Sequence, residues 1–217
     1  MFKRTGVIVH TRSYNTVKQS MRHEIIIRKS RFIGSAFHIT SEDEALSRLR
    51  DVRSEFPDAS HHCYAYVVRH DSLIQRFSDD GEPGGTAGMP ILQVIKTREL
   101  QNVLVVVTRY FGGIKLGAGG LVRAYSGTAA EVLDKAGMAS MVLSPRGIIS
   151  IDYAQVGQVE YFLHQKGVQI VETEYRDKVN MTVIVPMEWD DFHGMLNELC
   201  SGRLEHTRLS PVFHSWE

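Results

Sequence analysis

Short apolar runs and amphipathic stretches alternate over the first 140 positions, which predicts a mixed unit of strands and helices. A helix is expected from Ser41, which caps it while Glu44 completes a capping box, and Pro57 ends it. Pro90 suits the first turn of a second, shorter helix. The predicted strands cover residues 24–28, 31–39, 63–68, 73–77 and 103–108. The last of these begins with a continuous β-branched run, which is typical of a strand buried on both faces.

A glycine-rich segment, residues 108–125, follows this buried strand and leads into a helical stripe that ends at Gly137. Because glycine weakens regular structure, its five glycines imply close backbone approach or positive φ angles. We predict a strand-to-helix turn, with the helix beginning after Gly120 and its free amide groups forming a site for anions. Arg123 falls in the first turn of that predicted helix, so a negative group is expected nearby.

The pattern changes near residues 143–147, and the order beyond is strand, helix, strand, strand, helix, strand. The strands are expected at 148–153, 168–174, 179–185 and 203–209, with helices over 156–163 and 189–199. This β-α-β-β-α-β order is that of the split βαβ, or ferredoxin-like, sandwich. The chain is therefore predicted to be an α+β protein of two domains, residues 1–144 and 145–217.

Charge and composition narrow the classes of function. The charges of the 25 basic and 25 acidic side chains cancel, so the protein has no overall electrostatic field that attracts nucleic acid. Any nucleic-acid site must therefore be a local basic patch. Cys63 and Cys200 form no CxxC pair and no zinc-ligand spacing, which argues for a reduced, cytoplasmic protein. No apolar run approaches the roughly 18 residues of a membrane helix, and residues 1–12 do not resemble a signal peptide. We therefore expect no membrane association.

The glycine-rich segment departs from the known nucleotide-binding motifs. Gly112 and Gly117 have the spacing of Walker A glycines, but Ala118 and Gly119 replace the required Lys and Ser/Thr. A dinucleotide fingerprint begins at Gly117, but Val122 stands at its third glycine position. The signatures that accompany a kinase glycine loop are missing as well. These glycines are predicted to be mainly a requirement of the fold. That they also hold a ligand is the less favoured interpretation.

Three carboxylates, Asp79, Asp80 and Glu82, lie in a second glycine-rich loop, residues 78–88. They fit a Mg²⁺ site or an acid–base pair, an ordinary turn, or a partner that neutralises the cations of the glycine-rich segment. His61 and Cys63 share one strand face but supply only two metal ligands, so no metal site is predicted. No hydrolase signature occurs, and we assign no catalytic residue.

Aromatic and basic side chains are mixed in the glycine-rich segment. They are Arg109, Tyr110, Phe111, Lys115, Arg123 and Tyr125. This mixture suits stacking and phosphate contact with single-stranded nucleic acid. The alternative is that Phe111 and Tyr125 belong to the core, which we favour for Tyr125.

Four motifs together resemble the IMPACT family, in its bacterial, YigZ-like branch. They are Arg31-Phe32-Ile33-Gly34 and residues 58–65, 77–88 and 109–125. The resemblance implies a first domain with the fold of the second domain of a small-subunit ribosomal protein, a β/α sandwich. It also implies a second, ferredoxin-like domain similar to domains of the translocation factor EF-G.

The resemblance also connects the chain with translation. In eukaryotic relatives, the shared domain belongs to a regulator that restrains the amino-acid-starvation kinase by competing for its ribosome-associated activator protein. Those relatives carry an RWD-type domain in front, which this sequence lacks, so the same circuit is not expected here. Such a likeness of fold is an analogy, and the function has to be argued from the site.

We therefore expect a non-enzymatic, cytoplasmic protein that binds the ribosome, RNA or a ribosome-associated protein and regulates translation. Arg109, Lys115 and Arg123 are expected to contact phosphate or an acidic surface. The other predicted binding residues are Asp79, Asp80, Glu82, Tyr110, Gly112, Gly113, Gly117, Gly119 and Gly120. The alternative is an enzyme or small-ligand-binding protein that uses the loop 79–82 opposite the glycine-rich segment. No cofactor is expected, and no oligomeric state is predicted.

Overall fold

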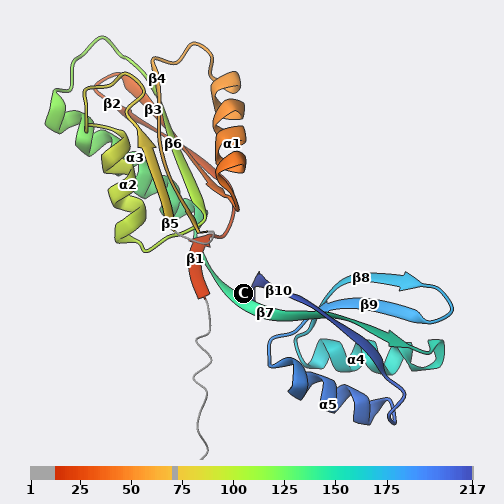
Figure 1. Ribbon diagram of the computed structural model, residues 1–217. Coiled ribbons are helices and arrows are strands. Elements are labelled where there is room, and N and C mark those ends of the chain that lie inside the picture. The colour runs from red at the N-terminus through yellow and green to blue at the C-terminus, as the bar shows by residue number, and fades with distance from the viewer. Residues whose placement is uncertain (1–12, 70–72, 217) are drawn as a thin grey trace, which may run out of the picture. The chain divides into compact units, whose positions relative to one another are not determined.

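The computed structural model describes residues 13–69 and 73–216, which form two compact units (Figure 1). The N-terminal unit comprises Tyr14–Ser140, and the C-terminal unit begins at Met141. The helices are α1 (Glu42–Glu55), α2 (Gly88–Thr97), α3 (Ala118–Ala136), the 3-10 turn η1 (Tyr153–Gln155), α4 (Val156–Gln165) and α5 (Trp189–Leu199). The strands are β1 (Ser13–Val17), β2 (Met21–Ile27), β3 (Ser30–His38), β4 (His61–Arg69), β5 (Leu73–Ser78), β6 (Val103–Tyr110), β7 (Met138–Ile151), β8 (Gln169–Tyr175), β9 (Val179–Ile184) and β10 (Glu205–Ser215). The predicted two-part α+β organisation is confirmed.

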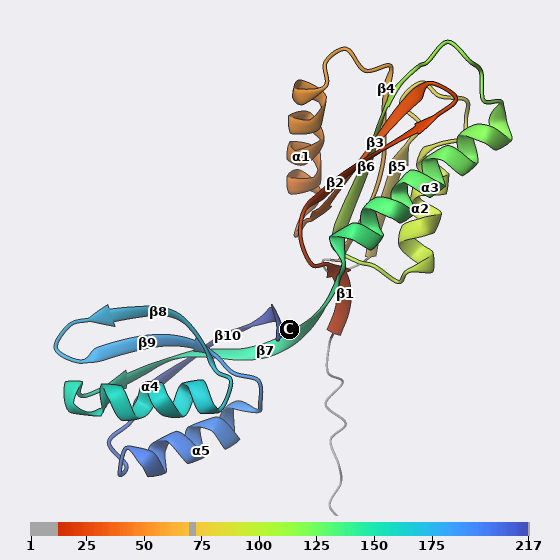
Figure 2. The same ribbon diagram turned by 180° about the vertical axis from the view of Figure 1, so that it is seen from behind.

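The N-terminal unit is built on an antiparallel sheet with the strand order β2-β3-β6-β4-β5. The central strand β6 is buried from Val103 to Arg109, which confirms the expectation of a strand covered on both faces. Helix α1 lies on one face of the sheet and helices α2 and α3 lie on the other (Figures 1 and 2). The unit therefore has a helical layer, and a hydrophobic core, on each side of the sheet.

The start of α1 follows the capping signal in the sequence, with one difference. The side chain of Ser41 accepts a hydrogen bond from the backbone amide of Glu44 at 3.1 Å, as a cap does. The Glu44 carboxylate, however, accepts from the amide of Thr40 at 2.9 Å rather than from the cap residue itself. The reciprocal bond of the predicted capping box is thus displaced by one residue.

Helix α3 begins earlier than its sequence predicts. Gly117 is the N-cap, with a φ of 72°, and the helix ends before the C-cap Gly137 as expected. Two glycines, 119 and 120, therefore lie inside the first turn, because burial of Leu121 and Tyr125 outweighs the low helix propensity of glycine. The placement of Arg123 in the first turn was wrong: it stands one turn further along.

The C-terminal unit has the β-α-β-β-α-β order predicted from the sequence. Its strands run antiparallel in the order β10-β7-β9-β8, the arrangement of a ferredoxin-like sandwich. Helices α4 and α5 cover one face of this sheet, and the side chains between them form a core of their own (Figure 1). The ferredoxin-like prediction is confirmed.

Strand β7 is longer than the predicted strand 148–153 because Pro145 does not interrupt it. The pairing of β7 with β10 shifts register between Leu209 and Val212, opposite this proline. A proline has no amide to donate, so a bulge in the partner strand accommodates it. Its carbonyl still accepts from the amide of Val185 at 3.0 Å. The last strand, β10, likewise continues past the predicted end, to Ser215.

Candidate functional site

The acidic loop is held by its own carboxylates, beginning with Asp79. This side chain accepts hydrogen bonds from the backbone amides of Gly85 at 2.8 Å, Ala87 at 3.0 Å and Gly88 at 2.8 Å. Because Gly88 is the first residue of α2, Asp79 caps that helix from outside it. With these three backbone donors, the Asp79 carboxylate stabilises the conformation of the acidic loop.

The second carboxylate, Asp80, joins the loop to α1 and β4. One of its oxygens accepts from the guanidinium of Arg53 at 2.9 Å, and the other accepts from the amide of His62 at 2.7 Å. Neither partner belongs to the glycine-rich segment. The idea that the two loops neutralise one another therefore does not apply to Asp79 or Asp80.

The third carboxylate, Glu82, does meet the glycine-rich segment, in a buried cluster with Arg109 and Tyr125. Its Oε1 atom accepts from Nη1 of Arg109 at 2.6 Å and from the hydroxyl of Tyr125 at 2.7 Å. The side chains of Glu82 and Arg109 are only 4% and 6% exposed. Burial is the main cause of a raised pKa at Tyr125, so its hydroxyl remains a donor. We call these three residues the buried cluster.

Arg109 makes further contacts within the protein. Its guanidinium lies 5.3 Å from the ring centroid of Phe32 and 5.5 Å from that of Phe111. Its Nη2 atom is 3.4 Å from the Oγ of Ser30, and its buried Nε has no hydrogen-bond partner among the described residues. This side chain, expected from the sequence to contact phosphate or an acidic surface, is thus paired with Glu82 and enclosed by its own chain.

Gly112 brings a second basic segment against the glycine-rich one. A Cβ atom at this position would overlap the backbone carbonyl of Lys29, in the turn between β2 and β3. The amide of Gly112 also donates to the Oγ of Ser30 at 3.1 Å. The exposed cations Arg28 and Lys29 therefore stand beside the segment. Sequence reasoning placed a turn here but missed its two cations, whose only signal was their position at the tip.

We define the basic rim as Arg28, Lys29, Lys115 and Arg123. All four residues are exposed, and no described carboxylate forms an ion pair with any of them. Arg28 and Arg123 line one pocket of about 160 Å³, and Leu116 lines both this pocket and the one that Lys115 borders. The rim thus retains two of the three predicted contact residues, and the β2–β3 turn adds two more.

The remaining predicted residues have separate environments. Tyr110 is half-buried beneath the guanidinium of Arg31, 5.1 Å from the ring centroid. Gly113 and Gly117 have φ angles of 82° and 72°, which favour glycine. Tyr125 is fully buried in the core, as favoured from the sequence. Phe111 is 51% exposed and does not belong to the core.

A pocket of about 350 Å³ lies between the two loops. Glu82, Arg109 and Lys115 contribute its charged lining. Apolar surface is provided by Phe111, Leu116 and Leu121. Gly117 and Ala118 at the start of α3 also line it. That helix has no side-chain cap and no acidic residue in its first turn, so its amides are open to an anion.

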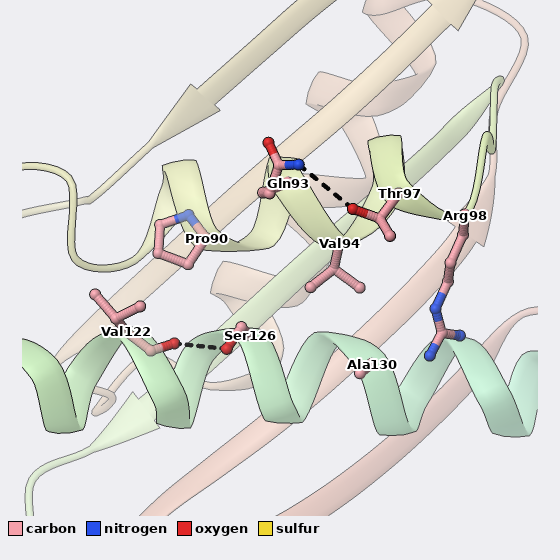
Figure 3. Close-up of a pocket in the computed structure, with 8 residues that line it drawn as sticks. All are labelled: Pro90, Gln93, Val94, Thr97, Arg98, Val122, Ser126 and Ala130. Atoms are coloured by element: carbon pink, nitrogen blue, oxygen red, sulfur yellow. Dashed lines mark hydrogen bonds between the residues drawn. The ribbon is translucent and has the colours of Figure 1, made fainter.

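A second pocket, of about 380 Å³, lies between α2 and α3 (Figure 3). Pro90, Val94 and Val122 line it with hydrocarbon. Its polar groups are satisfied close by, since Gln93 donates to Thr97 and Ser126 donates to the Val122 carbonyl within their own helices (Figure 3). This pocket therefore offers a ligand mainly apolar contacts.

Cys63 lies beside the acidic loop and is inert rather than reactive. Its thiol donates to the carbonyl of Asp79 at 2.9 Å, and burial raises the pKa of this thiol to about 12. The neighbouring His62 has a lowered pKa, chiefly because of burial. No group of three or more side chains within residues 13–69 and 73–216 is arranged to hold a metal ion.

Comparisons with known proteins match both halves of the chain. Residues 28–133 match the model of the Impact N-terminal domain, and residues 149–203 match a domain of unknown function, DUF1949. The IMPACT family member YvyE of Bacillus subtilis is 41% identical over 192 residues, which cover 88% of each chain. The chain belongs to the IMPACT family. The bacterial member YigZ of Escherichia coli is 36% identical, over 82% of this chain and 89% of its own.

Two solved structures are similar to this chain. The crystal structure of a hypothetical protein is 33% identical, with a TM-score of 0.60, over 91% of this chain and 98% of that one. A structure described as the two-domain translational regulator Yih1 is 27% identical, with a TM-score of 0.36, over 63% of this chain and 53% of that one. Within the described residues, no helix is both long and apolar enough to cross a membrane.

Proposed function

We propose that this protein is a non-enzymatic, cytoplasmic regulator of translation that binds RNA of the translation machinery through the basic rim. The observation that carries the proposal is the gathering, around the glycine-rich segment, of four exposed cations that form no ion pair with any carboxylate in the part of the chain that the structure describes. The chain as a whole has a formal charge of zero, so this is a local feature. Local basic patches of this kind are the electrostatic footprint of nucleic-acid binding.

The rim fits a phosphate backbone because its charges are spread over two adjoining segments. Arg28 and Arg123 flank one pocket, while Lys115 borders the next one, beside the open amides of α3. A strand of RNA carries one phosphate per nucleotide, so it can meet these cations in succession. The carboxylates of the acidic loop all have partners within the protein, so we assign them no part in contacting RNA phosphates.

The test is the affinity for fluorescently labelled RNA, measured by anisotropy at several salt concentrations. A quadruple variant replaces the rim with alanine: Arg28→Ala, Lys29→Ala, Lys115→Ala and Arg123→Ala. Because each lost phosphate contact lowers the salt slope, we expect the slope of log affinity against log salt to shrink by about 3 for single-stranded RNA. Co-sedimentation with ribosomes should weaken in parallel.

A matched control removes the same charge from other exposed positions of the N-terminal unit. It carries Arg50→Ala, Arg76→Ala, Lys96→Ala and Lys135→Ala. These changes should leave the salt slope within about one unit of the wild type, since only charges that meet phosphate release counterions. An equal loss in both variants would mean that net charge, and not the rim, governs binding. Absence of any salt-dependent binding by the wild type would contradict the proposed function.

A further inference from the structure

The pocket between the two loops has features that phosphate binding does not need. A phosphate site requires donors and positive charge, but this pocket also contains a largely exposed aromatic ring and a buried carboxylate. Phe111 is 51% exposed, although it follows directly on the buried strand β6. A planar apolar surface beside a cationic rim suggests a ligand that has both a flat face and a charge.

The polar groups of the pocket are not fully used by the protein. Both hydrogen bonds to Glu82 end on its Oε1 atom, and within the described residues no hydrogen bond reaches its Oε2 atom. The buried cluster therefore leaves one acceptor, the Oε2 atom of Glu82, unfilled at a pocket that this side chain lines. The amino groups on the edge of a nucleobase are donors that such an acceptor can meet.

We propose that this pocket binds one unstacked nucleobase, which stacks on Phe111 and meets Glu82 at its polar edge. Lys115, which also lines the pocket, would hold the phosphate attached to that base. The volume of about 350 Å³ lies in the range of sites for small organic ligands. The inference rests on the proposed function and makes it more specific: the RNA is single-stranded where it crosses the pocket.

The experiment compares Phe111→Ala with Phe77→Ala, a second exposed phenylalanine of the same unit. Both variants are titrated with a short single-stranded RNA and with a duplex of the same sequence. Loss of a stacking platform should weaken single-strand binding about tenfold in Phe111→Ala while leaving the salt slope unchanged. Phe77→Ala should stay within about twofold of the wild type, and Phe111→Trp should restore affinity because it keeps the flat face.

The outcomes distinguish a failure of the base-pocket proposal from a failure of the proposed RNA binding by the basic rim. If the rim variant loses RNA binding while Phe111→Ala binds as the wild type does, the base pocket is wrong and the proposed function stands. If Phe111→Ala weakens duplex and single strand equally, base stacking in this pocket is also refuted.

A free nucleotide carries the same base and phosphate as RNA, and it is therefore the alternative ligand for this pocket. Thermal shifts with nucleoside monophosphates test it, since a ligand that binds the folded state raises Tm. A shift that Phe111→Ala abolishes, together with no RNA binding, would keep the base pocket and overturn the proposed function. No shift and no RNA binding would overturn both.

Discussion

The buried cluster and the basic rim show that cations of one glycine-rich segment can have two different roles. One is buried and paired within the protein, and another is exposed and available to a partner. Arg109 and Lys115 are only six positions apart, yet Arg109 is enclosed with Glu82 while Lys115 stands exposed. A buried cation must be paired, because an uncompensated charge in the interior is costly. An exposed cation has no such requirement and is available to a partner. Basic residues in one motif therefore need not share one role.

The largest effect should come from breaking the buried cluster. In Glu82→Ala, Arg109 is left as an unpaired buried charge and Tyr125 loses its acceptor, so the free energy of unfolding should fall by about 3–5 kcal/mol. Urea denaturation followed by circular dichroism measures it. The double variant Glu82→Leu/Arg109→Met should recover part of the loss, because it removes both charges. A loss below about 1 kcal/mol in Glu82→Ala would mean that the pair contributes little.

The contact between the two basic segments should give the next largest effect. In Gly112→Ala, the new methyl group overlaps the Lys29 carbonyl, so the β2–β3 turn must move and stability should fall by about 1–3 kcal/mol. Gly127→Ala is the matched control, since open space surrounds that position inside α3. It should raise stability by about 0.5–1 kcal/mol. If the two variants unfold alike, the close approach of Gly112 to the turn is refuted.

The smallest effect concerns pH and the thiol of Cys63. Burial raises its pKa to about 12 in the folded protein, against about 8.5 in the unfolded chain. The unfolded chain therefore loses this proton first as pH rises, and stability falls from about pH 8.5 upward until the folded thiol ionises. Between pH 7 and about pH 9.5, the wild type should lose about 1 kcal/mol more than Cys63→Ala. Equal losses would show that this thiol is not protected.

Local signals in the sequence were enough for most of the fold. The cap at Ser41, the stop at Gly137 and the apolar run of β6 act within a few residues, so their consequences can be read directly. The start of α3 was missed because packing of distant core residues decides whether a glycine-rich turn becomes helical. The early start of β7 was missed for a related reason: the bulge that accommodates Pro145 within the strand lies in β10, far along the chain.

The site was predictable only in part, because burial depends on tertiary neighbours. The sequence identified the acidic loop and the glycine-rich segment, but it did not distinguish Arg109 from Lys115 and Arg123. Their difference arises where Glu82 reaches the end of β6. Arg28 and Lys29 entered the site only through the antiparallel pairing of β2 and β3, which carries their turn to Gly112.

The most direct test of the central claim is the salt dependence of RNA affinity, measured on the rim variant together with its stability. We predict a salt slope smaller by about 3 than that of the wild type, with the free energy of unfolding within about 0.5 kcal/mol. That result would separate a rim that binds from a cluster that stabilises. An unchanged slope, or a loss of stability as large as that of Glu82→Ala, would contradict the division of roles.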